Sequence, residues 1–175
     1  MITKSYLTIV LFMVILGSCA TKDSNDKSKN LKVNNIFEQQ RSAVLGKKIN
    51  SIVTILGDSI NAECKVILLY DGYDCETCID VGYEMLKRID DLAGKQKAYV
   101  ITTSLNIGRD QAKNEYFNYV YYDEHDIIRK ELKYIYTPVL LKLDSAVKVE
   151  EIFFPNYQRD LKNETRFVNL SSEKY

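Results

Sequence analysis

The clearest pattern along the chain is a series of short apolar runs separated by polar and turn-forming residues. Each run has about the length of one strand and is rich in β-branched, aliphatic or aromatic residues, so each predicts a largely buried strand. The predicted strands cover 66–70, 98–103, 117–122, 139–143 and 149–154. The last two are separated by Asp144-Ser145-Ala146, which predicts a closing hairpin.

Helices are predicted at 36–45, 107–116 and 126–133, with a last helix after residue 156. Apolar residues support the first and third of them, whereas 107–116 is polar and is expected to be a short helix in a connection. Asp123 or Asp126 should lie near the N-cap of the third of these. The segment 49–56 fits either a strand or a short amphipathic turn. We therefore predict an α/β protein with a central mixed β-sheet flanked by helices.

The strongest helical pattern begins just after Cys78 and ends at Gly94, a typical C-terminal stop. Its predicted apolar face consists of Gly82, Met85, Leu86, Ile89, Leu92 and Ala93. Its predicted polar face consists of Glu84, Lys87, Arg88, Asp90 and Asp91. Strand, helix and strand follow one another here, which predicts a βαβ unit with parallel strands and a right-handed crossover.

The first residues differ from this pattern. Lys4 precedes a continuous apolar run, 6–16, that is too short for a comfortable transmembrane helix. The run ends in Leu16-Gly17-Ser18-Cys19, which resembles a bacterial lipobox and implies lipidation of Cys19. An ordinary secretory signal with an unmodified cysteine, or a leader kept as an anchor, is the alternative.

The domain prediction follows from this. Residues 1–18 are the expected signal peptide, the polar stretch 19–35 is a flexible tether, and 36–175 is one domain. The implied location is the bacterial cell envelope, with the domain anchored to a membrane and outside the cytoplasm. The 24 basic and 24 acidic residues balance, and no basic run stands out, so nucleic-acid binding is not expected.

The candidate chemistry lies in Cys75-Glu76-Thr77-Cys78, between the first predicted strand and the strongest helix. The nucleophile in disulfide exchange is the thiolate, and a helix N-terminus stabilises negative charge. With Asp74 as the N-cap, Cys75 should be the exposed attacking thiol and Cys78 the more buried resolving thiol.

Four acids surround this pair: Asp71, Asp74, Glu76 and Asp80. The sequence has no Lys or Arg between Lys65 and Lys87. Like charge disfavours the thiolate, so Asp74 and Glu76 are expected to tune the Cys75 pKa upward. The hypothesis that follows is a reductant or a slow exchanger, not a strong oxidant.

Other uses of the cysteines have less support. Cys64 lies at the far end of the first strand, roughly 20 Å from the pair, and is expected to be a free or buried structural thiol. A zinc site needs further ligands, and the only histidine is His125, so neither metal nor cofactor is expected. A cysteine protease would need a partner motif for Cys75, and a peroxidase a nearby Arg; the sequence offers neither.

A second motif, Thr137-Pro138, stands directly before an apolar strand. Together with Cys-x-x-Cys and the order of elements, it makes residues 46–155 similar to the thioredoxin-like superfamily, especially TlpA/ResA-like thiol-disulfide oxidoreductases tethered to bacterial membranes. The resemblance implies a thioredoxin-like fold, a cis Pro138 in place of the usual trans form, and a substrate groove shaped by Thr137 and Pro138. The chain departs from the family in having no Trp and in having Glu76-Thr77 between the cysteines.

Two functions remain open. The first is disulfide exchange with exported thiol or disulfide proteins as partners, with Cys75 attacking and Cys78 resolving. The second is a non-catalytic thioredoxin-fold lipoprotein, binding or structural, in which the disulfide is static.

Overall fold

The computed structural model describes residues 35–57, 66–93, 97–156 and 159–173. The chain divides into two units, Met1–Gln39 and Gln40–Tyr175. In the first unit, residues 35–39 are described and are helical, with Gln39 Nε2 donating to Asn35 Oδ1 at 3.3 Å.

Some predictions fall on residues outside those described. They are the signal peptide, the lipidated Cys19 and most of the tether, together with Cys64 and the helix stop at Gly94. Across the described ranges, no helix combines the length and apolar character needed to cross a membrane.

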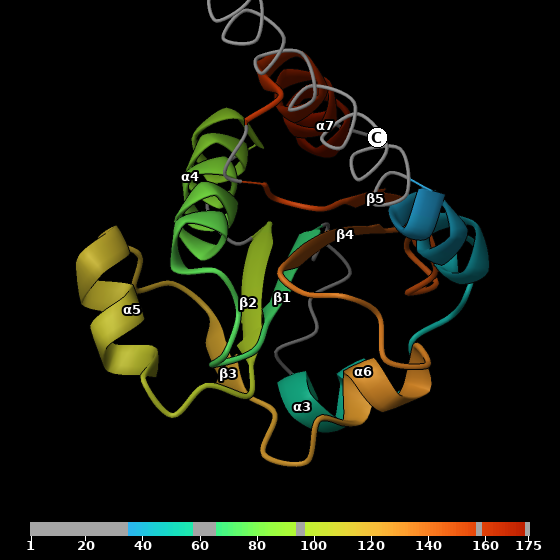
Figure 1. Ribbon diagram of the computed structural model, residues 1–175, viewed down its shortest axis with the longest axis horizontal. Helices are drawn as coiled ribbons and strands as arrows, with labels where there is room; N and C mark the ends of the chain where they lie inside the picture. Colours follow the sequence, from blue (N-terminus) through green and yellow to red (C-terminus); the bar gives the residue numbers. More distant parts are fainter. Residues whose placement is uncertain (1–34, 58–65, 94–96, 157–158, 174–175) are drawn as a thin grey trace, which may run out of the picture. The chain divides into compact units, whose positions relative to one another are not determined.

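A five-stranded sheet in the order β3-β2-β1-β4-β5 forms the centre of the unit (Figure 1). Its strands are β1 (Val66–Tyr70), β2 (Ala98–Thr102), β3 (Val120–Tyr122), β4 (Val139–Leu143) and β5 (Val149–Phe153). β1, β2 and β3 are parallel, whereas β4 is antiparallel to both β1 and β5. The mixed sheet, the parallel βαβ unit and the closing hairpin are confirmed.

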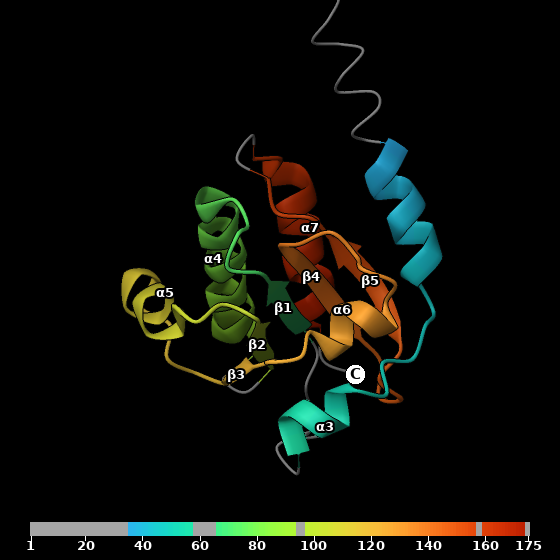
Figure 2. The ribbon, with the colours of Figure 1, turned by 60° about the horizontal axis from the view of Figure 1, so that its bottom comes forward.

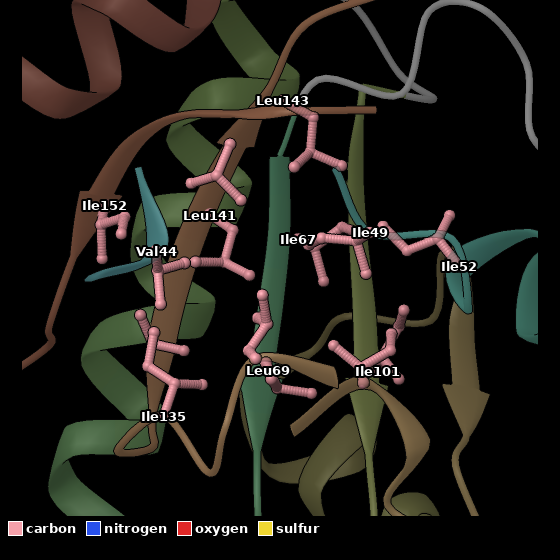
Figure 3. Close-up of a cluster of buried hydrophobic side chains, with 14 of the residues drawn as sticks. Val44, Ile49, Ile52, Ile67, Leu69, Ile101, Ile135, Leu141, Leu143 and Ile152 are labelled. Atoms are coloured by element: carbon pink, nitrogen blue, oxygen red, sulfur yellow. The ribbon is translucent and has the colours of Figure 1, made fainter. Parts of the chain in front are cut away.

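Helices cover both faces of the sheet. On one side lie α4 (Glu76–Ala93) and α7 (Leu161–Ser172), and on the other lie α3 (Ile52–Leu56) and α6 (Ile127–Glu131) (Figures 1 and 2). α5 (Ile107–Asn114) follows β2. Alternate residues of β1 divide between two apolar clusters: Ile67 and Leu69 join the α3–α6 side, while Leu68 packs with α4 and α7. Figure 3 shows the first of these clusters, and the side chains labelled there are all aliphatic; Tyr99 also belongs to the cluster.

Close packing of α4 on β1 explains one residue of its apolar face. A Cβ atom added to Gly82 would lie 2.7 Å from Leu68 Cδ1, so any larger residue there would force the buried Leu68 side chain to shift. Two side chains of α4 differ from the prediction. Leu92 is 60% exposed, whereas Asp90 is buried, because its carboxylate accepts hydrogen bonds from Ala98 N (3.2 Å) and the Tyr116 hydroxyl (2.9 Å).

The ambiguous segment at 49–56 contains the short helix α3. Tertiary contact helps to fix its start, since the Glu131 carboxylate of α6 accepts hydrogen bonds from the backbone N–H groups of Asn50 (2.8 Å) and Ser51 (2.9 Å). Of the two acids proposed near the N-cap of α6, Asp123 makes the capping bonds, to Ile127 N and Ile128 N. Asp126 makes no side-chain cap.

The third strand is shorter than predicted. β3 begins at Val120, and Phe117, which the pattern placed in the strand, is 69% exposed. Tyr119 has φ of +39°, which is not an extended conformation and ends the strand on that side.

Candidate functional site

Cys75 and Cys78 form a disulfide at the N-terminal end of α4, with their Cα atoms 5.2 Å apart. Cys75 directly precedes the helix, and Cys78 lies in its first turn. Cys75 is exposed and Cys78 is buried, as predicted. The cysteine at the surface is therefore the one that a second protein can reach.

The sulfur of Cys75 sits at the helix N-terminus. It accepts a hydrogen bond from Cys78 N at 3.3 Å and lies 3.2 Å from Thr77 Oγ1. Since α4 begins at Glu76, Cys75 itself takes the N-cap position, and the prediction that Asp74 is the N-cap is wrong by one residue. A thiolate on Cys75 would be stabilised directly by the Cys78 N–H.

Asp74 instead connects the loop between β1 and α4 (71–75, the cysteine loop) to the loop before β4. Its Oδ1 accepts a hydrogen bond from Thr137 Oγ1 at 3.0 Å, and its Oδ2 accepts one from Asp71 N at 2.6 Å. Burial raises the pKa of Asp74 above its ordinary value, and these two hydrogen bonds offset only part of that effect. Asp74 is a partly desolvated carboxyl held between two loops.

Asp71 anchors the same loop to α6 and to the end of β2. Its Oδ2 accepts hydrogen bonds from Arg129 Nη1 at 2.8 Å and from Thr103 Oγ1 at 3.0 Å. The two charged side chains are only 19% and 23% exposed, so this ion pair is better shielded from water than a surface pair.

On the opposite side of Cys75, Lys113 of α5 bridges two acids of α4. Its Nζ lies 2.8 Å from Glu76 Oε1 and 2.7 Å from Asp80 Oδ2. The ammonium group lowers the pKa of Glu76, which lies fully at the surface.

These contacts correct the interpretation of the acidic segment around the cysteines, which includes the loop residues Asp71 and Asp74 and the α4 residues Glu76 and Asp80. Three of its four acids pair with cations, Asp71 with Arg129 and both Glu76 and Asp80 with Lys113. The premise of unopposed negative charge is wrong, because the cations come from α5 and α6 and not from the local sequence. The raised Cys75 pKa and the reductant hypothesis stay predictions.

A pocket of about 200 Å³ lies between the start of α4, the loop after β2, and α5, and its lining includes Asp74 and Glu76, the sequence neighbours of Cys75. Its charged lining consists of Asp74, Glu76, Asp80, Arg109, Asp110 and Lys113. Asp110 is 8% exposed, and its Oδ2 accepts a hydrogen bond at 3.0 Å from the Tyr70 hydroxyl, whose ring is buried in the core. We call this the Glu76 pocket.

The Thr137-Pro138 peptide bond is cis, as the resemblance implied. Thr137 is half-buried and Pro138 is buried. Thr137 contacts Asp74, the residue before Cys75, by donating a hydrogen bond to its carboxylate. The substrate groove assigned to Thr137 and Pro138 stays a prediction.

His125 is exposed in the turn before α6. Within the described part of the chain, no group of three or more His, Cys, Asp or Glu side chains is arranged to hold a metal ion.

The sequence reasoning missed Arg129, Lys113 and Asp110. One signal could have found them, namely that the carboxyl ends of parallel strands meet at one edge of a sheet. β1, β2 and β3 are parallel and adjacent, so the segments after them, which carry these residues, converge beside Cys75.

No model of a known family matches the chain, and no curated protein matches it. Among solved structures, the thioredoxin domain of a thiol-disulfide oxidoreductase from Bacteroides vulgatus is similar, with a TM-score of 0.50 and 10% identity over 64% of this chain and 82% of that chain. A thioredoxin-family thiol:disulfide interchange protein from Chlorobium tepidum has a TM-score of 0.47 and 14% identity, covering 64% and 83%. A secreted disulfide oxidoreductase from Mycobacterium tuberculosis has a TM-score of 0.46 and 12% identity, covering 64% and 84%.

The first of these similarities bears on the fold. A five-stranded mixed sheet flanked by helices, matched to a thioredoxin domain over most of that domain's length, is a thioredoxin-like fold. The predicted fold class is confirmed, and the Cys-x-x-Cys disulfide lies at the start of the helix that follows β1.

Proposed function

We propose that the protein is a thiol-disulfide oxidoreductase of the bacterial envelope that exchanges disulfides with exported proteins. One observation carries this proposal: an exposed Cys75 is bonded to a buried Cys78 at the first turn of α4 in a thioredoxin-like fold. A disulfide with one accessible sulfur at a helix N-terminus has the arrangement that exchange requires.

In the reducing direction, the Cys75 thiolate attacks one sulfur of a substrate disulfide. The substrate S–S bond breaks, a mixed disulfide forms between Cys75 and the substrate, and the first substrate sulfur leaves as a thiolate that takes up a proton. Cys78 then loses its proton and attacks the Cys75 sulfur, which releases the second substrate thiol. The substrate gains two electrons, and the protein ends with the Cys75–Cys78 disulfide. The oxidising direction is the reverse of these steps.

The chain's own groups support these roles. The Cys78 N–H hydrogen bond, the nearby Thr77 hydroxyl and the α4 N-terminus all stabilise negative charge on Cys75 Sγ. They stabilise it as the attacking thiolate in the reducing direction, and as the leaving group in the oxidising direction, when the second substrate thiol displaces Cys75 from the mixed disulfide. Burial of Cys78 limits its contact with other proteins, which suits the resolving role.

The location is part of the proposal and rests on the leader pattern in the sequence. A lipidated Cys19, followed by the polar stretch to residue 35, would hold the domain at a membrane surface. Exported proteins that carry thiols or disulfides would then be the substrates.

A second candidate is a binding or structural lipoprotein whose disulfide is static. The observation that favours it is the bracing of the cysteine loop, which Asp71 ties to Arg129 and Asp74 ties to Thr137. A loop held at two points suits a fixed disulfide as well as a preorganised reactive one.

The reduction potential of the purified full chain, kept in detergent, separates the two. For an exchange catalyst we expect a reversible two-electron couple between roughly −120 and −280 mV, with insulin reduction in the presence of dithiothreitol. Cys75→Ser should abolish both, while Cys64→Ser serves as the matched control and should keep them. A potential below about −300 mV without exchange would establish the static disulfide instead.

A further inference from the structure

The Glu76 pocket is lined by the two residues that flank Cys75 in the sequence, although neither cysteine is part of its lining. Glu76, which stands between the two cysteines, forms part of its wall, and Asp74, which precedes Cys75, forms another part. At about 200 Å³ the pocket is smaller than the roughly 300–1,000 Å³ sites that hold drug-sized ligands, so its size suits one side chain. A group bound in it would lie next to any substrate attached to Cys75.

The lining of the pocket has an excess of negative charge. It contains four carboxyl groups (Asp74, Glu76, Asp80, Asp110) and two cationic groups (Arg109, Lys113). With every group ionised, four negative and two positive charges leave a formal charge of −2.

The two cations offset little of this negative charge, because of where they lie. The Lys113 ammonium is already shared between Glu76 and Asp80, at 2.8 and 2.7 Å, so little of its charge is left for a bound anion. The Arg109 side chain is 68% exposed, and its Nε is 3.5 Å from Asp110 Oδ1, so water screens that cation strongly. Asp110 itself is 8% exposed, backed by the Tyr70 hydroxyl, and forms a fixed negative wall.

We propose that the Glu76 pocket is a subsite for a basic side chain, Lys or Arg, close in sequence to the cysteine of the substrate. The inference rests on the proposed exchange function, since it is the mixed disulfide with Cys75 that brings the substrate to the pocket. Both sequence neighbours of Cys75 line the pocket, and an extended chain advances about 3.3 Å per residue, so the substrate residues placed near the pocket are those next to the substrate cysteine in sequence. A long, flexible basic side chain can enter while its backbone stays over the disulfide.

The test uses three short peptides, each with one internal disulfide, that differ only at the residue next to one cysteine: Lys, Gln or Glu. The dithiol form of the full chain is mixed with each peptide, and the second-order rate constant of exchange is measured. We expect Lys to exceed Glu by about three- to tenfold at low salt, with Gln between them, because charges at the rim of an interface act mainly on association. The ratio should fall towards one in 1 M salt.

Variants of the protein make the test more specific, because each should change the ratio of the exchange rate constants for the Lys and Glu peptides (the Lys-to-Glu ratio). Any change in Cys75 reactivity affects all three peptides alike and cancels in that ratio. Asp80→Asn should lower it, and Lys113→Gln should raise it, since the first removes a negative charge from the pocket and the second a positive one. Asp91→Asn, at an exposed position near the other end of α4, is the matched control and should leave it unchanged.

The outcomes are distinguishable. Equal rates for the three peptides, or faster exchange with Glu, would overturn the basic subsite and leave the oxidoreductase standing. A ratio that responds to Asp91→Asn as strongly as to Asp80→Asn would show long-range attraction instead of a pocket, and would also overturn it. Failure of all three peptides to exchange, with insulin also untouched, would overturn the proposed function and the subsite together.

Discussion

The two sides of the cysteine loop carry similar charges in different surroundings. On one side, Asp71 and Asp74 are half-buried and connect the loop to α6 and to the loop before β4. On the other, Glu76 is exposed and is paired with Lys113 across the gap to α5. The pKa of Asp74 is raised by burial, and the pKa of Glu76 is lowered by its cation.

Two acids that flank the same cysteine therefore respond oppositely to their surroundings. A carboxyl that loses contact with water favours its neutral form, whereas one that faces a cation in water favours its charged form. The count of acidic residues around Cys75 does not predict the field at the sulfur. Burial and partners of each acid decide it.

The largest effect is expected on the half-buried side, from Arg129→Met. This change removes the cation from Asp71 and leaves a carboxylate at the end of β1 that is shielded from water. We expect a loss of about 1–3 kcal/mol in the free energy of unfolding, measured by urea denaturation, because an unpaired buried charge retains its desolvation cost.

Arg166→Met is the matched control for that measurement. Arg166 is 68% exposed, and its Nη2 is 3.8 Å from Glu151 Oε2, so its loss should cost much less. Arg129→Lys should recover part of the stability. Equal losses for Arg129→Met and Arg166→Met would show that the Asp71 pair adds nothing beyond an ordinary surface contact.

A smaller change in the free energy of unfolding is expected from Asp74→Asn, and its size should depend on pH. Because the folded-state pKa of Asp74 is raised above 3.8, the folded protein binds more protons than the unfolded chain as pH rises through this region. The wild type therefore loses stability with rising pH relative to the Asn variant, by at most about 1.4 kcal/mol per pH unit. Unfolding free energies measured from pH 3 to 7 would show this slope.

For Glu76→Gln, we expect the stability difference between wild type and variant to change with pH in the opposite direction. The folded-state pKa of Glu76 lies below 4.5, so its ionised form stabilises the fold above that value, and the contribution is lost as the pH falls. The difference between wild type and this variant should grow with rising pH in favour of the wild type. Slopes of the same sign for both variants would mean that the two acids share one environment.

The smallest effect is expected from Lys113→Gln. The side chain of Glu76 lies at the surface, so removal of the ammonium should leave the unfolding midpoint almost unchanged. The Glu76 pKa should rise towards its ordinary value, as a carbon-13 titration of the carboxyl group would show. In 1 M salt the wild-type value should approach that of the variant; a wild-type pKa insensitive to both changes would rule out Lys113 as the cause.

Much of the fold follows from short-range patterns. The runs at 66–70 and 139–143 are apolar for their whole length and form central strands with the predicted bounds. The helix that carries Cys78 was predicted, although it begins at Glu76, and four of the six residues of its predicted apolar face are buried: Gly82, Met85, Leu86 and Ile89. The Cys75–Cys78 bridge follows from a separation of three residues. Asp90 was misplaced because its partners lie on β2 and at Tyr116, outside the helical pattern.

By itself, then, the sequence determined most of the strands and helices, which cysteines pair, and which cysteine is exposed, since these depend on neighbours within a few residues. Only the tertiary structure decided the electrostatics of the candidate site. Lys113 and Arg129 lie 37 and 58 residues from the acids they contact, Glu76 and Asp71, and a parallel sheet brings their helices to the edge where Cys75 stands. The sequence shows which side chains are ionisable, but the partner of each group and its exposure to water depend on how distant segments pack together.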